Sequence, residues 1–249
     1  MLLSIVNLSS CKIESKEGNI GHIHSFLFDD HSWTIRYLIV DTGHWLPGRK
    51  VLLSPEVLGE VKEFKNTLHI ELTMDQIRNS PDIDTEKSVS RQHEIELHRY
   101  YNWVPYWTGS FGTETIPYAP TDLEINEDIK QQQKSEEETE SHLRDTDEVT
   151  GYKIHANDGQ IGHLDDFIIS RDGWKIRYIV VDTSKWLLDR KVIIPPDWIK
   201  EIDWATSEVV VDVSKDAVKD SPGFNPAEPV NREYESQLYD YYGRPRYWV

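Results

Sequence analysis

The chain has 249 residues, a formal net charge of −17 and a hydrophobic content of 38%. This length allows one large domain or two of ordinary size, with enough apolar residues to build cores. Neither half carries a basic stripe that could neutralise several phosphates, so we expect no nucleic-acid binding. The single cysteine, Cys11, excludes an internal disulfide and a multi-cysteine zinc site, and we expect it to be buried as a small apolar side chain.

No apolar run in the sequence is long enough to cross a membrane. The opening MLLSIVNLSSCKI also lacks the basic start and the small-residue cleavage site of a signal peptide. We therefore expect a soluble, cytoplasmic protein with no membrane insertion.

A long internal repeat organises the chain. The stretch WTIRYLIVDTGHWLPGRKVLLSP, residues 33–55, returns 141 residues later as WKIRYIVVDTSKWLLDRKVIIPP, residues 174–196, without a gap. Roughly one position in three is identical over the central part of this alignment, which is too much for chance. A period this long predicts two whole domains, a first at residues 1–107 and a second at residues 150–249.

Each copy begins with a series of short strands. Partly alternating polarity predicts a strand at residues 20–30 and another at 161–170, and each of these ends at a polar turn. The almost continuously apolar, β-branched segments that follow are typical of strands covered on both faces. Shorter strands complete each copy. The later expected strands lie at residues 33–42, 49–54 and 67–72 in the first copy and at 174–183, 190–195 and 208–213 in the second.

Each copy then continues into two short helices and an aromatic tail. Thr73 and Ser214 are expected to begin a first helix that ends at a proline, and Ser90 and Asn231 have the side chains of N-caps for a second helix. The tails that follow read NWVPYW at residues 102–107 and GRPRYW at residues 243–248.

The segment between the copies, residues 108–149, is strongly acidic. It carries a net charge of about −9, against about −4 for each of the flanking segments. Its apolar residues are too sparse to offset the entropy of ordering the chain, so we expect a flexible tether. A helix within it remains an alternative.

These strands resemble the PRC-barrel family, the small all-β module found in the cytoplasmic part of the photosynthetic reaction centre H subunit and in a small-subunit ribosome maturation factor. The resemblance rests on the G-x-I-G-x opening, on RYLIVDTG and RYIVVDTS, and on RKVLLSP and RKVIIPP. It covers about residues 8–72 and 149–213. It implies a mainly β fold with two small PRC-type β-barrels in tandem, each followed by short helices and an aromatic tail.

The tails resemble bacterial proteins that carry two such modules, in which a SRQHE…YYGWPYYW segment follows each barrel. The first copy matches this pattern closely, but the second has Tyr234 in place of the histidine and Arg244 in place of a tryptophan. The family implies a binding or adaptor role. It supplies no catalytic residues and names no partner.

Two histidines allow a different hypothesis. His22 and His24 lie two apart on an expected strand and should face the same side, as two metal ligands would, and the second copy offers His163 and Asp165 there. A metal-dependent or acid–base enzyme is therefore the alternative function. No third ligand recurs with a suitable spacing, so we expect no metal, no cofactor and no enzymatic activity.

Two Asp–Arg pairs could fix the loops that follow the central strands. Asp41 ends the apolar strand of the first copy and Arg49 opens the next, and Asp182 and Arg190 are placed in the same way in the second copy. An enzyme hypothesis would make the aspartate a general base. We favour structural ion pairs, because no nucleophile or phosphate-binding glycine loop accompanies them.

The aromatic residues indicate an interface. The loop residues Trp45 and Leu46, and their counterparts Trp186 and Leu187, form apolar knobs on polar connections, and an isolated barrel would expose them. We predict that the two barrels pair about a pseudo-twofold axis and bury these knobs, with a homo-oligomer as a further option. The tail residues of the same candidate interface are Tyr106, Trp107, Tyr247 and Trp248. The function that we expect is a non-catalytic scaffold that mediates protein–protein interaction, with an unknown protein partner.

Overall fold

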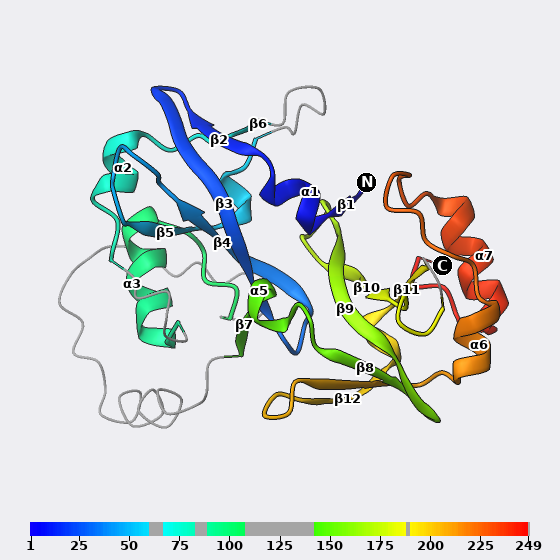
Figure 1. The fold of residues 1–249 in the computed structure, drawn as a ribbon. Coiled ribbons are helices and arrows are strands. Elements are labelled where there is room, and N and C mark those ends of the chain that lie inside the picture. The colour runs from blue at the N-terminus through cyan, green and yellow to red at the C-terminus, as the bar shows by residue number, and fades with distance from the viewer. Residues whose placement is uncertain (60–66, 83–88, 108–141, 188–189, 249) are drawn as a thin grey trace, which may run out of the picture.

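The protein is described by a computed structural model over residues 1–59, 67–82, 89–107, 142–187 and 190–248. It is mainly β, with two sheets and a few short helices. Figure 1 shows two lobes side by side. Helices α2 (Met74–Arg78) and α3 (Arg91–Tyr101) lie on the outer side of one lobe, and α6 (Lys215–Asp220) and α7 (Arg232–Tyr242) lie on the outer side of the other. We call the described parts of residues 1–107 and 142–248 the first and second modules. The predicted tether at residues 108–141 lies outside the described residues.

The first module contributes a six-stranded sheet in the order β5-β4-β3-β2-β6, with β7 of the second module paired to β3. Strands β2 and β6 are parallel, and the other pairs are antiparallel. Its elements are β1 (Leu2–Ser4), α1 (Ile5–Ser9), β2 (Lys12–Ser15), β3 (Gly18–Asp29), β4 (Thr34–Asp41), β5 (Lys50–Leu53), the 3₁₀ helix η1 (Pro55–Val57), β6 (Thr67–His69), α2 (Met74–Arg78) and α3 (Arg91–Tyr101).

The second module repeats this arrangement with one more strand. Its sheet has the order β11-β10-β9-β8-β13-β12, and β1 of the first module is paired to β9. Its elements are β7 (Leu143–Asp145), α5 (Thr146–Val149), β8 (Lys153–Ala156), β9 (Gly159–Ser170), β10 (Ile176–Asp182), β11 (Lys191–Ile194), the 3₁₀ helix η2 (Pro196–Trp198), β12 (Ile199–Asp203), β13 (Glu208–Val211), α6 (Lys215–Asp220) and α7 (Arg232–Tyr242).

The helix starts agree with the sequence. The side chain of Thr73 accepts a hydrogen bond from the backbone N–H of Gln76 in a capping box, and Ser214 caps α6 through Ala217. Ser90 and Asn231 cap α3 and α7 in the same manner. The predicted N-caps are therefore confirmed, and Cys11 is buried as expected, with 8% of its surface exposed.

One glycine in each copy is required by a close approach of two strands. A Cβ on Gly21 would lie 1.9 Å from the backbone oxygen of Asp41, and a Cβ on Gly162 would lie 2.1 Å from that of Asp182. The φ angles of the two glycines, +140° and +159°, are also rarely adopted by other residues. The glycine of the repeated I-G-H sequence is thus explained by the close approach of β3 to β4, and of β9 to β10.

The two modules exchange their N-terminal segments. We call β1 and α1 the first arm, and β7 and α5 the second arm. The first arm adds to the sheet of the second module, where Leu2 is opposite Ser170. The second arm adds to the sheet of the first module, where Leu143 is opposite Asp29. This places residues 143–149 within the fold and corrects the sequence-based connector, which extended to residue 149. The physical reason is that Val149 is buried in the core, so this part of the segment is held by apolar packing.

A second contact between the modules lies at the tips of the β3–β4 and β9–β10 hairpins. Thr34 is bridged to Lys175, and the N–H groups of Ile35 and Ile176 donate to the carbonyls of Trp174 and Trp33, at 2.9 and 2.7 Å. Each contact is converted into the other by adding or subtracting 141. The modules are therefore related by a pseudo-twofold axis near this bridge.

The core is continuous across the modules. One cluster of buried apolar residues takes members from β3, β4 and β5 and from β9, β10 and β11. Phe28 of β3 and Phe167 of β9 are fully buried, and their ring centroids lie 5.7 Å apart. In the described part of the chain, no helix is both long and apolar enough to pass through a bilayer. The modules thus share this cluster, and a second cluster joins Leu97 of the first module to Leu143 of the second arm.

Candidate functional site

The two loop tryptophans contact their own modules. The indole N–H of Trp45 donates to the carbonyl of Ile20 at 2.6 Å, and the guanidinium of Arg78 lies 5.8 Å from the ring centroid. The ammonium of Lys215 lies 4.9 Å from the ring centroid of Trp186. Each knob is thus packed near the short helix α2 or α6. The modules contact each other through the arms, the hairpin tips and the core pair of Phe28 and Phe167. A role for the knobs at an interface stays a prediction.

The expected pairing of Asp41 with Arg49 is wrong. In the ladder of β4 and β5, Asp41 is opposite Lys50, and its carboxylate accepts from the N–H of Gly43. The guanidinium of Arg49 turns away to donate to the carbonyls at the end of α2, those of Arg78 and Ser80. Side chains alternate along a strand, so the residue next to Lys50 points elsewhere.

The second copy shows the same correction. Asp182 is opposite Lys191 and accepts from the N–H of Ser184, while Arg190 donates to the carbonyls of Lys219 and Ser221 at the end of α6. Both arginines therefore satisfy carbonyls that a helix leaves without partners. Arg49 also lies 3.6 Å from the carboxylate of Asp82, so the ion pair that it makes is with a residue beyond α2 and not with Asp41.

A buried carboxylate holds the first tail in place. Glu94 of α3 is 2% exposed, and its Oε2 accepts from the hydroxyls of Tyr37, at 3.0 Å, and Tyr106, at 2.6 Å. Arg91 lies 3.0 Å from the other oxygen. Burial raises the pKa of Glu94, and the hydrogen bond from Tyr106 and the charge of Arg91 oppose this shift. Tyr106, which we predicted at an interface, is thus hydrogen-bonded to Glu94 of its own module.

The second module contains the same network. The Oε1 of Glu235 accepts from the hydroxyls of Tyr178 and Tyr247, both at 2.7 Å, and Arg232 lies 3.1 Å from Oε2. Sequence reasoning missed these glutamates. The available signal was an Arg and a Glu three residues apart at the same place in both second helices.

One position of the network differs between the modules. His98 is 7% exposed, and its Nε2 lies 2.8 Å from the hydroxyl of Tyr37. Burial lowers the pKa of His98, which favours the neutral imidazole. The equivalent residue of the second module is Tyr239, which is also buried. Of these two equivalent buried positions, only that of the first module carries an imidazole.

Two of the clefts between the modules lie beside the aromatic tails. The first holds about 330 Å³ and combines the tail of the first module with the β9–β10 turn of the second. The second holds about 190 Å³ and combines the opposite parts. Residues that line the first cleft include Arg36, His98, Trp103, Val104, Tyr106 and Arg171. Residues that line the second include Trp33, Lys175, Arg177, Asp197, Tyr239 and Tyr247. Each cleft is lined by residues of both modules.

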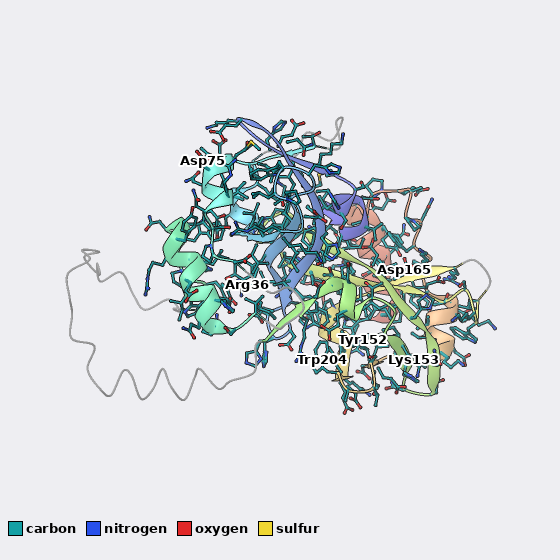
Figure 2. The ribbon with its side chains drawn as sticks, turned by 60° about the vertical axis from the view of Figure 1, so that its left-hand side comes forward. Arg36, Asp75, Tyr152, Lys153, Asp165 and Trp204 are labelled. Carbon is teal, nitrogen blue, oxygen red and sulfur yellow. The ribbon has the colours of Figure 1, made fainter. Side chains whose placement is uncertain are left out.

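A guanidinium stacked on a tail tyrosine lies in each cleft. Arg36 lies 3.9 Å from the ring centroid of Tyr106, and Arg177 lies 4.4 Å from that of Tyr247. Figure 2 shows Arg36 nearer the middle of the molecule than Asp75, which lies on the outer helix α2. Arg171 enters the first cleft from the other module and donates to the carbonyl of Gly59 at 2.8 Å.

The residues of the metal hypothesis are arranged differently in the two modules. His22 and His24 are both exposed and share a face of β3, as predicted. In the second module, ligand atoms of His163, Asp165 and Asp182 lie within 4.8 Å of one another, so the fold adds a third residue that the spacing did not indicate.

The acidic part of this group already has a cation beside it. The Nζ of Lys191 lies 2.6 Å from Asp165, and Nε2 of His163 lies 3.7 Å from Asp182. A second group, formed by Asp30, His31 and His142, lies where the second arm meets the first module. There, Arg144 takes one oxygen of Asp30 at 3.1 Å. Both groups are therefore charge-compensated by protein side chains.

A scan against protein families identifies part of this architecture. Residues 146–218, which run from α5 into α6, match the PRC-barrel domain. The matched part of the second module is a PRC-barrel domain. This domain includes β8 to β13 of the second sheet, while α7 and the aromatic tail lie beyond the matched range. A search of curated proteins found no match. The resemblance drawn from the sequence is thus confirmed for the second copy.

Proposed function

We propose that the chain is a non-catalytic binding scaffold in which two PRC-barrel modules present the composite clefts to a protein partner. In this proposal, the first module is also a PRC-barrel, like the matched part of the second module. This assignment is supported by the shared strand order and by the 141-residue offset that relates the two arm contacts. The PRC-barrel domain is a general β module, and its presence is compatible with a binding role.

The observation that carries the proposal is the joint construction of the clefts. Each cleft takes walls from both modules, and each contains a guanidinium stacked on a tyrosine. Arginine and tyrosine are enriched among the residues that dominate protein–protein binding. The side chain of Val104 at the first cleft is 82% exposed, which places an uncovered apolar group beside them.

A photo-crosslinking experiment tests this proposal on the full chain. A photoreactive amino acid is placed at Val104, and a matched variant carries it at Val6, which is 59% exposed on α1 and does not line the clefts. We expect a recurrent protein adduct from native cell extract for the Val104 variant only. Equal adducts at both positions, or no adduct at Val104, would contradict the proposal.

A second candidate function is metal-dependent chemistry in the second module. It is favoured by the group of His163, Asp165 and Asp182, whose ligand atoms lie within 4.8 Å of one another. It is weakened by Lys191, because its ammonium already neutralises one of the carboxylates. A chelator and a metal titration separate this candidate from the scaffold.

A further inference from the structure

The contacts made by the two arms are equivalent in backbone but not in side chains. Each arm pairs with the end of a long strand of the other module, β9 for the first arm and β3 for the second. We call the receiving strand end and the turn after it the groove of that module. At three positions, the residues of arm and groove differ between the modules, and in each case the difference in the arm is matched by one in the groove.

The first matched position is a Ser–Asp pair that occurs in both directions. Ser4 of the first arm donates to Asp166 of the second groove at 2.5 Å. In the equivalent contact, Ser25 of the first groove donates to Asp145 of the second arm at 2.9 Å. Asp166 is 8% exposed and Ser25 is fully buried. Each contact therefore joins one carboxylate to one hydroxyl.

The second matched position concerns a buried backbone N–H. The N–H of Phe26 in the first groove donates to the hydroxyl of Thr146 in the second arm at 3.1 Å. The equivalent N–H, that of Phe167, is satisfied within its own module by the Asp166 carboxylate at 2.7 Å. The first arm accordingly has the apolar Ile5 where the second has Thr146. The arm supplies an acceptor only where the groove has none.

The third matched position is an ion pair. Arg144 of the second arm lies 3.1 Å from Asp30 of the first groove, whose side chain is 8% exposed. Its guanidinium also lies 4.3 Å from the ring centroid of Trp204, which is near Tyr152 in Figure 2. The equivalent residues of the other contact are Leu3 in the first arm and Arg171 in the second groove. The positively charged second arm thus lies beside a negative residue of the first groove. The first arm is neutral at this position, and the second groove is positively charged.

We infer that these three positions form a recognition code that lets a first module pair with a second module and rejects pairing between modules of the same kind. Pairing of two second modules would place Asp145 against Asp166 in a buried site and Arg144 beside Arg171. Like charges brought together away from water are strongly unfavourable.

Pairing of two first modules is also disfavoured, for a different reason. Leu3 would lie beside Asp30, whose carboxylate would lose the guanidinium that it has in the native contact. Ile5 would lie beside the N–H of Phe26, which would be left without an acceptor. A buried donor without a partner costs more than the hydrogen bond contributes.

The code has a consequence for assembly. A chain whose modules pair only with the other kind can close on itself, or exchange modules with a second chain to form a closed ring. A chain whose modules pair with their own kind would join one neighbour through each end and continue without closing. The three positions therefore protect this two-module protein against open-ended polymerisation.

An arm-exchange variant tests the inference on the full chain. It carries Leu3→Arg, Ser4→Asp and Ile5→Thr in the first arm, and Arg144→Leu, Asp145→Ser and Thr146→Ile in the second, so that composition is unchanged. Each arm then matches its own groove. After refolding at high concentration, wild type should elute as a monomer or closed dimer, and the variant should form larger, concentration-dependent species in size-exclusion chromatography with light scattering.

A compensating variant keeps the test decisive if arm exchange prevents folding. It adds Ser25→Asp, Asp166→Ser, Asp30→Arg and Arg171→Asp, which exchange the grooves as well, and it should restore the size and most of the melting temperature of wild type. A smaller cycle uses Ser4→Asp alone, which should lower the melting temperature. Adding Asp166→Ser and Ile5→Thr should recover it, because the threonine replaces the acceptor that the N–H of Phe167 loses with Asp166. The inference is overturned if the arm-exchange variant keeps the size and stability of wild type, or if neither compensation restores what was lost.

Discussion

The two modules differ in a way that separates structural residues from functional candidates. The Glu–Tyr contacts that hold the second helix and the tail to the sheet are the same in both modules, as Glu94 and Glu235 show with their pairs of tyrosine hydroxyls. Positions at the arm contacts differ, but each difference is compensated by its partner across the interface. Positions in the clefts differ without compensation, as with His98 and Tyr239. Differences without such compensation indicate positions at which the two modules differ in function.

Removal of a large side chain from the shared core should have the largest effect. Phe28 is fully buried and packs against Trp33 and Phe167, so Phe28→Ala should lower the free energy of unfolding by about 3–5 kcal/mol. Because the core is continuous, we expect one cooperative transition that shifts as a whole in differential scanning calorimetry.

Ile169→Val in β9 is the matched mild control, since it is buried in the same core and removes one methylene for about 0.5–1.5 kcal/mol. Two separate transitions, of which only one moves in Phe28→Ala, would show that the modules unfold independently.

The glutamate networks should be equivalent in the two modules. Glu94→Gln and Glu235→Gln keep the shape of the side chain but remove the charge that accepts two hydroxyls and faces an arginine. Each should cost about 1–3 kcal/mol in urea unfolding followed by circular dichroism. If only one of the two variants lost free energy of unfolding, the two networks would differ in stability despite their equivalent geometry.

Much of the fold follows from local sequence. Thr73, Ser214, Ser90 and Asn231 predicted the starts of the helices, because an N-cap is decided by a few neighbouring residues. The arms could not be predicted in this way. The arm strands β1 and β7 are only three residues long and pair with strands more than a hundred positions away. Their apolar residues show no period of their own, since burial depends on the other module.

The candidate site was less predictable for the same reason. The ion pair proposed between Asp41 and Arg49 was based on closeness along the chain, but strand register directs Arg49 to the end of α2. The third member of the group around His163 is Asp182, which the sheet brings beside it from the next strand. The clefts depend on both modules at once, so the pattern of one copy could not indicate them.

Stability should respond to acid through His98 of α3 in the first module. Burial lowers the pKa of His98 below its ordinary value of 6.5, so the unfolded chain binds this proton more readily than the native state. The contribution of His98 is therefore complete above that value and is lost as the pH falls through the interval between the two pKa values. His98→Tyr should reduce the fall in melting temperature between about pH 7.5 and about pH 5.5.

The second module supplies the matched control. Tyr239→His introduces an imidazole at the equivalent buried position and should steepen the same pH dependence. An unchanged pH dependence in His98→Tyr would mean that the other histidines account for it.

The smallest effect is expected from metal removal. A bound metal stabilises the native state in proportion to its affinity and concentration, so a chelator would lower the melting temperature if His163, Asp165 and Asp182 held one. Because the ammonium of Lys191 already lies 2.6 Å from Asp165, we expect no change in melting temperature with chelator and none with added zinc.

Lys191→Met removes the competing charge and should make the melting temperature more responsive to zinc, while the same substitution combined with His163→Ala should not. A drop of several degrees in the wild-type chain with chelator, restored by zinc and absent in His163→Ala, would favour the metal-dependent candidate over the scaffold.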